Sequence, residues 1–319
     1  MNLPKTSDLE KELVSRLRES TSGNARAMAA TVVIVSSADR AATSDAVVDK
    51  LMGRRPARVI HLRGSSPEGL KSWSSARCAI DRQSRGVCFE DIYLESSDDA
   101  AFESRSWGPF VIRELPSLLF WNLGPRELCS CGFDCAEKVD LTFLDGSADL
   151  ELSGQSIKSY AEEASSAAQS VLGFTDLTWE RLARERLIIS RLFDGANRAD
   201  ELDGIRRVLI RHKDGWSAAL LGAWVAERLQ KRNPNLKIDA EQSENNETDR
   251  VDFALRDGRK ATVLFQDERL SSLTFADGES LELSLPESDD GAILARLVDT
   301  PLADPLYAAA LRYLEKGQF

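Results

Sequence analysis

A short run of β-branched residues, Thr31 to Ser36, places the strongest constraint on what this chain can fold into. Its apolar residues follow one another without polar alternation, which predicts a strand buried on both faces of a sheet. A helical stretch from Ala42 to Met52 comes next, followed by a second buried run from Pro56 to Leu62. Because short links join strand, helix and strand, this segment predicts a βαβ crossover between two parallel strands.

The sequence up to residue 198 extends this pattern. Leu9, Leu13 and Leu17 recur at helical spacing and predict an amphipathic helix over Asp8 to Glu19. The segment from Leu70 to Asp81 has no clear period. We expect strands at Gly86–Leu94, Leu118–Trp121 and Val139–Leu144, and helices at Phe102–Glu114 and Ser156–Val171. Residues 1–198 are therefore expected to form an α/β domain with a mostly parallel sheet and flanking helices.

Two Asp-Gly pairs organise the second half of the chain. Asp257-Gly258 and Asp277-Gly278 each stand between two strand-like runs. They predict two hairpins with two-residue turns of type I′, and hence an antiparallel β-meander. The other elements expected here are a strand at Ile205–Arg211 and helices at Gly215–Lys231, Gly291–Val298 and Asp304–Leu314. Residues 199–319 are therefore expected to form an α+β domain.

An acidic charge balance limits the partners of the chain. It has 41 Lys and Arg against 52 Asp and Glu, a formal net charge of −11, which argues against nonspecific binding to nucleic acid. No apolar run approaches the roughly 20 residues that span a bilayer. Residues Met1 to Ser20 contain many charges and lack the apolar region of a signal peptide. We therefore expect a soluble cytoplasmic protein that binds neither nucleic acid nor membrane.

Three of the five cysteines lie close together, at Cys129, Cys131 and Cys135. An odd number of cysteines in a long chain indicates reduced thiols and not a disulfide framework. The spacing suits a metal site or a redox-responsive thiol cluster. Zinc sites usually combine two Cys-x-x-Cys pairs, however, and only two histidines, His61 and His212, are available. We predict no metal, and both a redox role and an ordinary exposed loop stay open.

The sequence contains no recognisable catalytic motif. A glycine-rich dinucleotide fingerprint, a P-loop, a nucleophile elbow and a zinc-protease motif are all missing. With His61 in a strand and His212 at a strand end, a Ser-His-Asp triad is not expected. Gly64, Ser65 and Ser66 follow the second strand, where open α/β sheets bind ligands, but a plain turn is the favoured interpretation. We expect neither an active site nor a cofactor.

The stretch from Asp176 to Leu182 (DLTWERL) predicts the start of a helix. Asp176 is placed to accept a backbone N–H as N-cap, and Glu180 lies in the first turn, where the helix dipole favours a carboxylate. The helix is expected to continue to Asp194. Trp179 fits a buried core position, which directs Arg181 outward or toward a partner.

The same stretch resembles the Asp-Leu-Thr/Ala-Trp-x-Arg motif of the glucose-6-phosphate dehydrogenase assembly protein family (OpcA). Weaker likenesses to this family follow in order along the chain, in Arg58–Ile60, Glu114–Leu119, Leu220–Leu229 and Asp304–Ala308. The chain departs from the family in two places. It has Glu185-Arg186 where members commonly have a Trp-Arg pair, and Phe120-Trp121 where they often have two tryptophans.

The resemblance implies a non-catalytic protein that binds glucose-6-phosphate dehydrogenase and promotes its active oligomer as an allosteric activator in the oxidative pentose phosphate pathway. It also implies that the partner-binding residues include Asp176, Trp179, Arg181 and Arg186. Two other interpretations stay open. One is a nucleotide- or phosphate-binding α/β enzyme that uses the strand-end crevice, and the other is a thiol-based redox sensor that uses the cysteine cluster.

Overall fold

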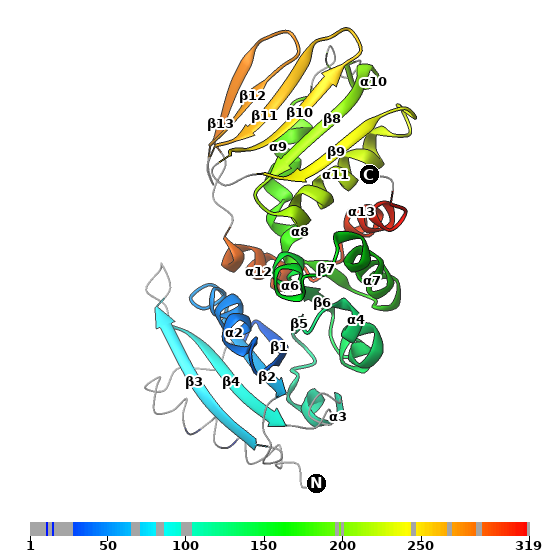
Figure 1. Cartoon of the computed structure of the whole chain (residues 1–319). Coiled ribbons are helices and arrows are strands. Elements are labelled where there is room, and N and C mark those ends of the chain that lie inside the picture. Colours follow the sequence, from blue (N-terminus) through cyan, green and yellow to red (C-terminus); the bar gives the residue numbers. More distant parts are fainter. Residues whose placement is uncertain are drawn as a thin grey trace. The chain divides into compact units, whose positions relative to one another are not determined.

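The computed structural model describes residues 28–64, 71–80, 86–96, 104–194, 201–243, 247–266, 270–284 and 289–317, together with Lys11, Ser15 and Arg198. The described part contains a mostly parallel sheet and then a mostly antiparallel sheet, each with helices (Figure 1). The predicted α/β fold class is therefore confirmed. Most of the expected opening helix, and both Ser65 and Ser66, lie outside the described ranges.

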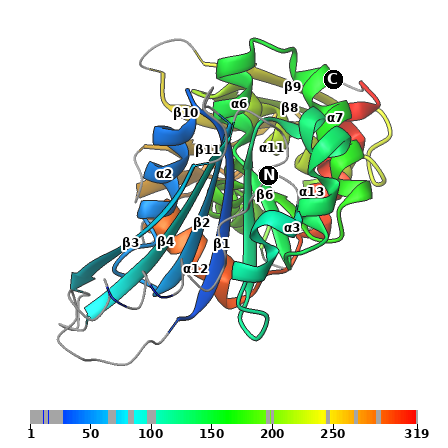
Figure 2. The same ribbon diagram turned by 90° about the horizontal axis from the view of Figure 1, so that it is seen from below.

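The first sheet has seven strands in the order β3-β4-β2-β1-β5-β6-β7, parallel throughout except between β3 and β4 (Figure 2). Its strands are β1 (Ala30–Ser37), β2 (Ala57–Gly64), β3 (Lys71–Ile80), β4 (Gly86–Ser96), β5 (Ser117–Asn122), β6 (Leu141–Leu144) and β7 (Phe174–Asp176). The helices along this part of the chain are α2 (Ala41–Asp49), α3 (Ser104–Trp107), η2 (Gly108–Phe110), α4 (Pro125–Glu127), η3 (Leu128–Gly132), α5 (Phe133–Ala136), α6 (Gly146–Ser153) and α7 (Ile157–Ser170).

Strand β1 is central, between β2 and β5. Val32 lies opposite Val59 of β2 and Leu118 of β5, all in parallel register. Every residue from Ala30 to Ser36 is buried, as expected for a strand covered on both faces. The predicted βαβ crossover through α2 is confirmed.

One face of the first sheet packs against α2 and against α12 (Asp290–Asp299). Val32 and Ile34 of β1 share a buried apolar cluster with Val47 and Val48 of α2. Helix α12 contributes four aliphatic side chains to the same cluster, namely Ile293, Leu294, Leu297 and Val298. Each such burial stabilises the fold by about 1.5–3 kcal/mol.

Two segments in this part of the chain differ from expectation, one within the first sheet and one between its strands β4 and β5. The segment without a clear period forms β3, because its backbone pairs along the length of β4 although many of its side chains are polar. The single helix expected over residues 102–114 is wrong. The described part holds only the short helix α3 and the 3₁₀ helix η2, because Gly108 and Pro109 disfavour continuation of an α-helix.

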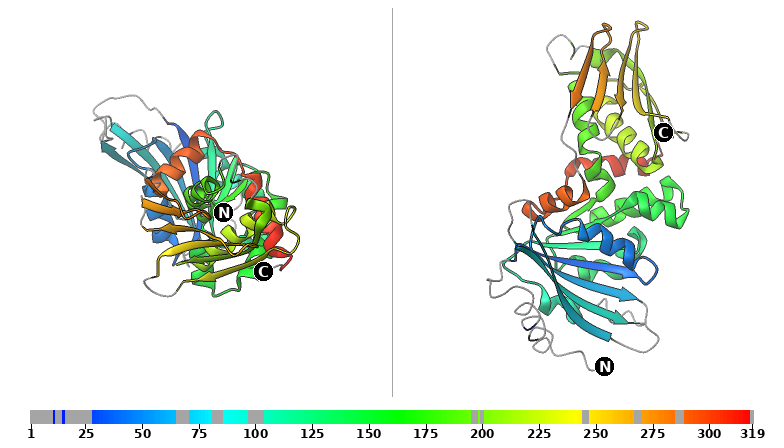
Figure 3. Two further views of the ribbon diagram at one scale, coloured as in Figure 1. Left: turned by 90° about the horizontal axis from the view of Figure 1, so that it is seen from above. Right: turned by 90° about the vertical axis from the view of Figure 1, so that its left-hand side faces the viewer.

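The second sheet has six strands in the order β13-β12-β11-β10-β8-β9, antiparallel except between β8 and β9. In the left-hand view of Figure 3, β10 to β13 run side by side as yellow and orange strands. The predicted meander is confirmed. The elements are α8 (Leu177–Arg181), α9 (Ala183–Arg191), α10 (Glu201–Gly204), β8 (Ile205–His212), α11 (Gly215–Leu229), β9 (Lys237–Gln242), β10 (Asp249–Leu255), β11 (Lys260–Phe265), β12 (Leu270–Thr274), β13 (Ser280–Ser284) and α13 (Pro305–Glu315).

The hairpin turns are longer than the type I′ turns that were expected. The Gly258 N–H donates to the Leu255 carbonyl at 3.2 Å, and Gly258 has a φ of 88°. These features match the longer hairpin loop that ends in a left-handed residue. Asp257 favours this form, because its Oδ1 accepts the N–H of Arg259 at 3.0 Å.

The chain divides into two compact units that interleave along the sequence. Unit 1 comprises Met1–Asp145, Ser166–Leu177 and Asp289–Ala303, and unit 2 comprises Gly146–Ser165, Thr178–Ser288 and Asp304–Phe319. A single boundary after residue 198 was predicted from the sequence. The apolar face of α12 completes the core of the first sheet, which places this late segment of the chain in unit 1.

Candidate functional site

The DLTWERL stretch is not the start of one long helix. Asp176 is the last residue of β7, where it pairs with Leu144 of β6, and the chain then enters the short helix α8. The α-helix is interrupted at Leu182, whose ψ of 0° departs from the helical value, and it resumes in α9. The expected continuous helix is therefore wrong, because the stretch is a strand-to-helix junction followed by a second, separately started helix.

Trp179 lies at the centre of a cluster that joins three helices. Its ring is fully buried, and its Nε1–H donates to the Asp304 carboxylate at 2.9 Å. The guanidinium carbon of Arg186, on α9, lies 3.6 Å from the centroid of the indole ring. Tyr307, on α13, packs its ring 5.6 Å from the same indole. These four residues are referred to below as the Trp179 cluster.

Asp304 serves two elements of the Trp179 cluster at once. One carboxylate oxygen accepts the N–H of Leu306 at 2.9 Å and caps the start of α13, and the other accepts from Trp179. The Arg186 guanidinium lies 3.8 Å from the same carboxylate. The cluster therefore fixes α13 to α8 and α9 through one charged group that has a partner on each side.

The predicted partner-binding residues thus have different positions. Asp176 and Trp179 are fully buried, so their side chains do not reach a surface, and the interpretation of Trp179 as a core residue is confirmed. Arg181 is partly exposed. Arg186, which was predicted to bind the partner, is mostly buried: only 11% of its side chain is exposed, and its Nη1 donates to the Trp179 carbonyl at 2.6 Å.

Sequence reasoning did not find Asp304 or Tyr307 as members of this site. They stand 125 and 128 positions after Trp179, and no local period connects them with it. The available signal was the Asp304-Pro305 pair, which is typical of a capped helix start. That signal predicts the helix but not its contact.

Glu185 adds a buried carboxyl next to Arg186 in the sequence. Burial raises the pKa of this carboxyl above its ordinary value, against the opposite effect of a backbone hydrogen bond and of His212 and the neighbouring arginines. Its Oε2 has no hydrogen-bond partner among the described residues.

The turn between β1 and α2 lies where open α/β sheets bind dinucleotides, at the carboxyl end of the central strand. It consists of Ala38, Asp39 and Arg40 and contains no glycine, whereas glycines normally allow the backbone of such a turn to approach a pyrophosphate closely. A hydrogen bond from Ser37 lowers the pKa of Asp39 and keeps it ionised. A carboxylate at this turn repels a phosphate group. The turn therefore does not fit a dinucleotide.

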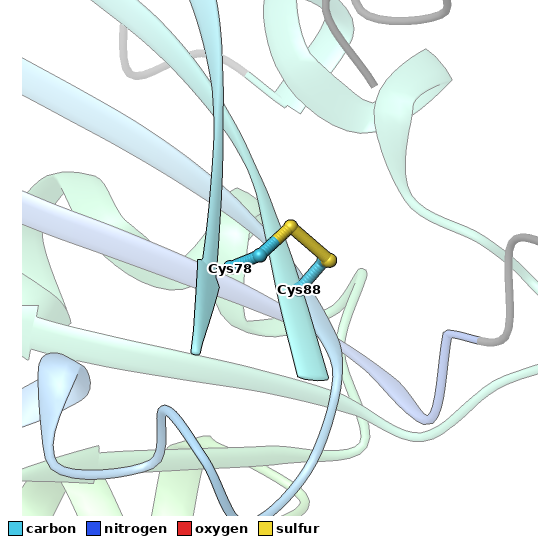
Figure 4. The surroundings of a disulfide bond; sticks show 2 residues. All are labelled: Cys78 and Cys88. Atoms are coloured by element: carbon cyan, nitrogen blue, oxygen red, sulfur yellow. A yellow bond between two sulfur atoms is a disulfide. The ribbon is translucent and has the colours of Figure 1, made fainter. Parts of the chain in front are cut away.

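Two cysteines form a bond that the sequence analysis did not expect. Cys78 of β3 and Cys88 of β4 lie directly opposite each other and form a disulfide (Figure 4). The expectation that the thiols are all reduced is therefore wrong. An odd number of cysteines does not show which of them lie opposite each other on neighbouring strands.

From the sequence, an exposed loop was one interpretation of the other three cysteines. That interpretation is wrong, because the backbone of this segment is helical. Residues 128–136 form helical turns, with Cys129 exposed and Cys135 fully buried. The side chain of Cys131 lies outside the described part. Among the side chains that are described, no group of three or more His, Cys, Asp or Glu residues is arranged to hold a metal ion. No described helix is long and apolar enough to span a membrane.

Several solved structures share a distant likeness with the chain. UDP-N-acetylglucosamine 3-dehydrogenase from Acidithiobacillus ferrooxidans is 9% identical, with 91% of this chain and 96% of that chain covered and a TM-score of 0.47. A dehydrogenase from Clostridium difficile is 7% identical, with coverages of 90% and 98% and a TM-score of 0.48. Likeness at these values assigns neither a fold family nor an activity to this chain.

Two protein-family models match the chain in order. The model for the glucose-6-phosphate dehydrogenase subunit N-terminal domain matches residues 48–156, and the model for the C-terminal domain of the same subunit matches residues 172–311. Comparison with curated proteins gives no match. The two models are successive domains of one family and between them span most of the chain, which confirms the resemblance seen in the DLTWERL stretch. The chain therefore belongs to the OpcA family of glucose-6-phosphate dehydrogenase subunits.

Proposed function

We propose that this chain is a non-catalytic assembly factor that binds glucose-6-phosphate dehydrogenase and activates it allosterically. The observation that carries the proposal is the match of both parts of the chain to domains of a glucose-6-phosphate dehydrogenase subunit. Such an activator binds the active conformation of the enzyme more tightly than the inactive one. A coupling free energy of about 1–3 kcal/mol, typical of allosteric proteins, changes the affinity of the enzyme for substrate about 5- to 150-fold. We expect the chain to act in the cytoplasm with its partner.

The turn between β1 and α2 supports a role without catalysis. An enzyme that uses a nicotinamide dinucleotide at this sheet needs a close approach of backbone to pyrophosphate. Asp39 and the side chains beside it oppose that approach. We therefore favour the assembly role over a nucleotide-dependent enzyme.

We assign the partner contact to the outer face of α8 and α9. Asp176, Trp179 and Arg186 are buried or nearly so, and their role in this proposal is to hold the two helices in place. Arg181 is partly exposed, and Leu187 of α9 exposes 45% of its surface. Arginine is enriched at protein interfaces, and an exposed leucine gains stability when a partner removes it from water.

The experiment measures dehydrogenase kinetics and complex size with increasing amounts of this protein. We expect a higher kcat or a lower KM for glucose 6-phosphate, a larger complex, and no turnover by the protein alone. Unchanged kinetics and an unchanged complex size at saturation contradict the proposal.

The surface assignment is tested with Leu187→Ser and a matched control. Leu281, on β13, also exposes 45% of its surface, so Leu281→Ser removes the same side chain from a different element. We expect Leu187→Ser and Arg181→Ala to weaken complex formation and Leu281→Ser to leave it unchanged. If the two leucine variants have equal effects, the assignment of the interface to α9 is wrong. That outcome would not contradict the assembly role itself.

A further inference from the structure

His61, on β2, is buried with an acidic group at each of its two ring nitrogens. Its Nδ1 lies 2.9 Å from a carboxylate oxygen of Asp45, on α2. Its Nε2 lies 3.1 Å from a carboxylate oxygen of Asp91, on β4. Only 1% of the residue is exposed, so water does not replace either contact. All three residues belong to unit 1.

The hydrogen-bonding capacity of these groups determines the protonation state of the imidazole ring. An ionised carboxylate only accepts hydrogen bonds, and a neutral imidazole has one nitrogen that donates and one that accepts. Two carboxylates therefore bind both nitrogens only when both carry a proton, which makes the ring an imidazolium cation. Ionised Asp91 is supported by Arg77 of β3, whose guanidinium donates two hydrogen bonds to it, at 2.7 and 2.8 Å.

The charges around His61 hold α2 against the sheet. On α2, Asp45 also binds Arg63 of β2, and Asp49, one turn later, accepts from Arg77 at 2.7 Å. On β4, Glu95 faces Arg63 at 3.4 Å, and the Tyr93 ring stacks on the imidazole with centroids 4.2 Å apart. With a protonated His61, three cations face the four carboxylates of Asp45, Asp49, Asp91 and Glu95. A neutral ring leaves two cations for the same four carboxylates, and it also weakens the attraction of the ring for the face of Tyr93.

The second histidine of the chain has the opposite arrangement. The Nδ1 of His212 accepts the backbone N–H of Asp214 at 3.1 Å, so that nitrogen carries no proton. Its Nε2 lies 3.5 Å from Asp249. The chain has two histidines, which gives the comparison an internal control.

We propose that His61 is a buried imidazolium that clamps α2 to the first sheet, and that its deprotonation is a pH-sensitive release of this helix. Asp45 and Asp49 on α2, Arg63 on β2, Arg77 on β3, and Asp91, Tyr93 and Glu95 on β4 are the charged and titratable groups that face the clamp. The clamp ties α2 to strands β2, β3 and β4, so its release loosens the crossover between β1 and β2.

The first test is nitrogen NMR of the two imidazole rings in the full chain near neutral pH. We expect two protonated nitrogens in His61, and one protonated and one unprotonated nitrogen in His212. The titration midpoint of His61 is expected above the ordinary value for a histidine. An unprotonated ring nitrogen in His61 near neutral pH overturns the proposal.

The second test measures hydrogen exchange of the α2 amides, corrected for the intrinsic pH dependence of exchange. We expect protection of α2 to fall about tenfold or more as the pH passes through the titration of His61, since one pKa unit corresponds to a tenfold change. Amides of α11 are the internal reference and are expected to keep their protection. Protection of α2 that follows α11 across this range contradicts a local release.

The Asp45→Asn variant tests whether His61 is a cation or a neutral histidine with a structural role. Asparagine keeps the shape of the side chain but removes the charge that favours the protonated ring. We expect the His61 midpoint to fall and α2 to lose protection at a lower pH. Asp249→Asn is the matched control, and it is expected to affect His212 only. An Asp45→Asn protein with an unmoved His61 midpoint overturns the clamp, and His61→Gln is expected to abolish the pH dependence of α2 altogether.

Discussion

The Arg186 guanidinium stacks 3.6 Å above the Trp179 ring and donates a hydrogen bond to the carbonyl of the same tryptophan. One side chain therefore contacts both the ring and the backbone of a residue seven positions earlier, across the break between α8 and α9. The break does not leave the two helices independent, because Arg186 and Asp304 connect them. Trp179 of the DLTWERL stretch is thus part of a structural joint within unit 2.

Loss of this joint should lower stability. We expect Trp179→Ala to cost about 3–5 kcal/mol, the usual cost of truncating a large buried aromatic residue. Arg186→Ala should cost about 1–3 kcal/mol, since it removes a charged hydrogen bond and a cation–π contact. Arg191→Ala is the control, because 59% of the Arg191 side chain is exposed and its ion pair with Asp194, at 3.2 Å, lies on the surface. Urea unfolding of the three variants checks the order, and an Arg186 variant as stable as the Arg191 variant contradicts the joint.

Gly291, at the start of α12, should not tolerate a side chain. A Cβ at this position would lie 2.1 Å from the backbone oxygen of Lys50, at the end of α2. Gly291→Ala must therefore push α12 away from α2, and we expect a loss of about 1–3 kcal/mol, as for other overpacked sites. Gly108→Ala is the matched control, because nothing lies within 4 Å of a Cβ there. Thermal melts of both variants check this expectation, and equal melting temperatures would exclude a tight contact.

Asp91 should make unit 1 sensitive to acid. Burial alone raises the pKa of this carboxyl, but hydrogen bonds and charge from Arg77 and His61 outweigh burial and hold the pKa below its ordinary value. A carboxyl with a lowered folded pKa stabilises the fold above its unfolded pKa, about 3.9, and this contribution is lost as the pH falls through the folded value. We expect Asp91→Asn to be less stable by about 3–5 kcal/mol near neutral pH, and to lose less stability on acidification.

The control for acid sensitivity is Asp239→Asn. Asp239 pairs with Arg207 on an exposed strand surface, where 47% of the aspartate side chain is accessible. An exposed pair of this kind contributes at most about 1 kcal/mol. Chemical unfolding at several pH values distinguishes the two variants. An acid dependence that is the same in wild type and Asp91→Asn would show that other carboxyls carry the effect.

His61 should make unit 1 sensitive to alkaline pH, opposite to the effect of Asp91. Burial lowers the pKa of its ring, but the hydrogen bonds and charges of Asp45 and Asp91 outweigh burial and raise the pKa above 6.5. A raised folded pKa gives stability that is complete below the unfolded value and is lost as the pH rises through the folded value. Unit 1 should therefore be most stable between the acid loss of Asp91 and the alkaline loss of His61. Unfolding measured from acid to alkaline pH in wild type and His61→Gln checks the alkaline side.

Reduction of the Cys78–Cys88 bond should loosen the hairpin of β3 and β4. The bond closes a short loop of sequence separation 10, for which loop-closure entropy gives about 2–3 kcal/mol. We expect reductant to lower the melting temperature of wild type and to release two thiols. The double variant Cys78→Ser, Cys88→Ser should melt at the temperature of the reduced wild type and should not respond to reductant. A wild-type melt that ignores reductant would contradict a stabilising role.

Sequence patterns predicted those parts of the fold that follow from local period. The β-branched run at β1 and the two Asp-Gly hairpins needed no distant information, and both were found. Strand β3 was missed because Lys71, Ser72, Ser74 and Ser75 give it no apolar period, and only its pairing with β4 makes it a strand. The same limit applies to the candidate site. Trp179 was predicted as a core residue from local spacing, but its contact with the distant Asp304 was not predicted.

The exposure of Arg186 also depends on distant residues. Helical spacing places Arg186 on the same face as Trp179, seven positions earlier, but it gives no information about the Asp304 carboxylate that lies beside the guanidinium. The disulfide illustrates the same limit, because Cys78 and Cys88 become neighbours only through the register of β3 and β4.

Helix α12 has a consequence for the order in which the chain folds during synthesis. Its side chains Ile293, Leu294 and Leu297 cover the core that β1 and α2 begin. Protein domains generally fold one after another as they leave the ribosome. Unit 1 departs from that order, because its last core element emerges only after every strand of the second sheet has been made. We therefore expect the apolar surface of α2 to stay uncovered through most of translation, until residue 299 has appeared.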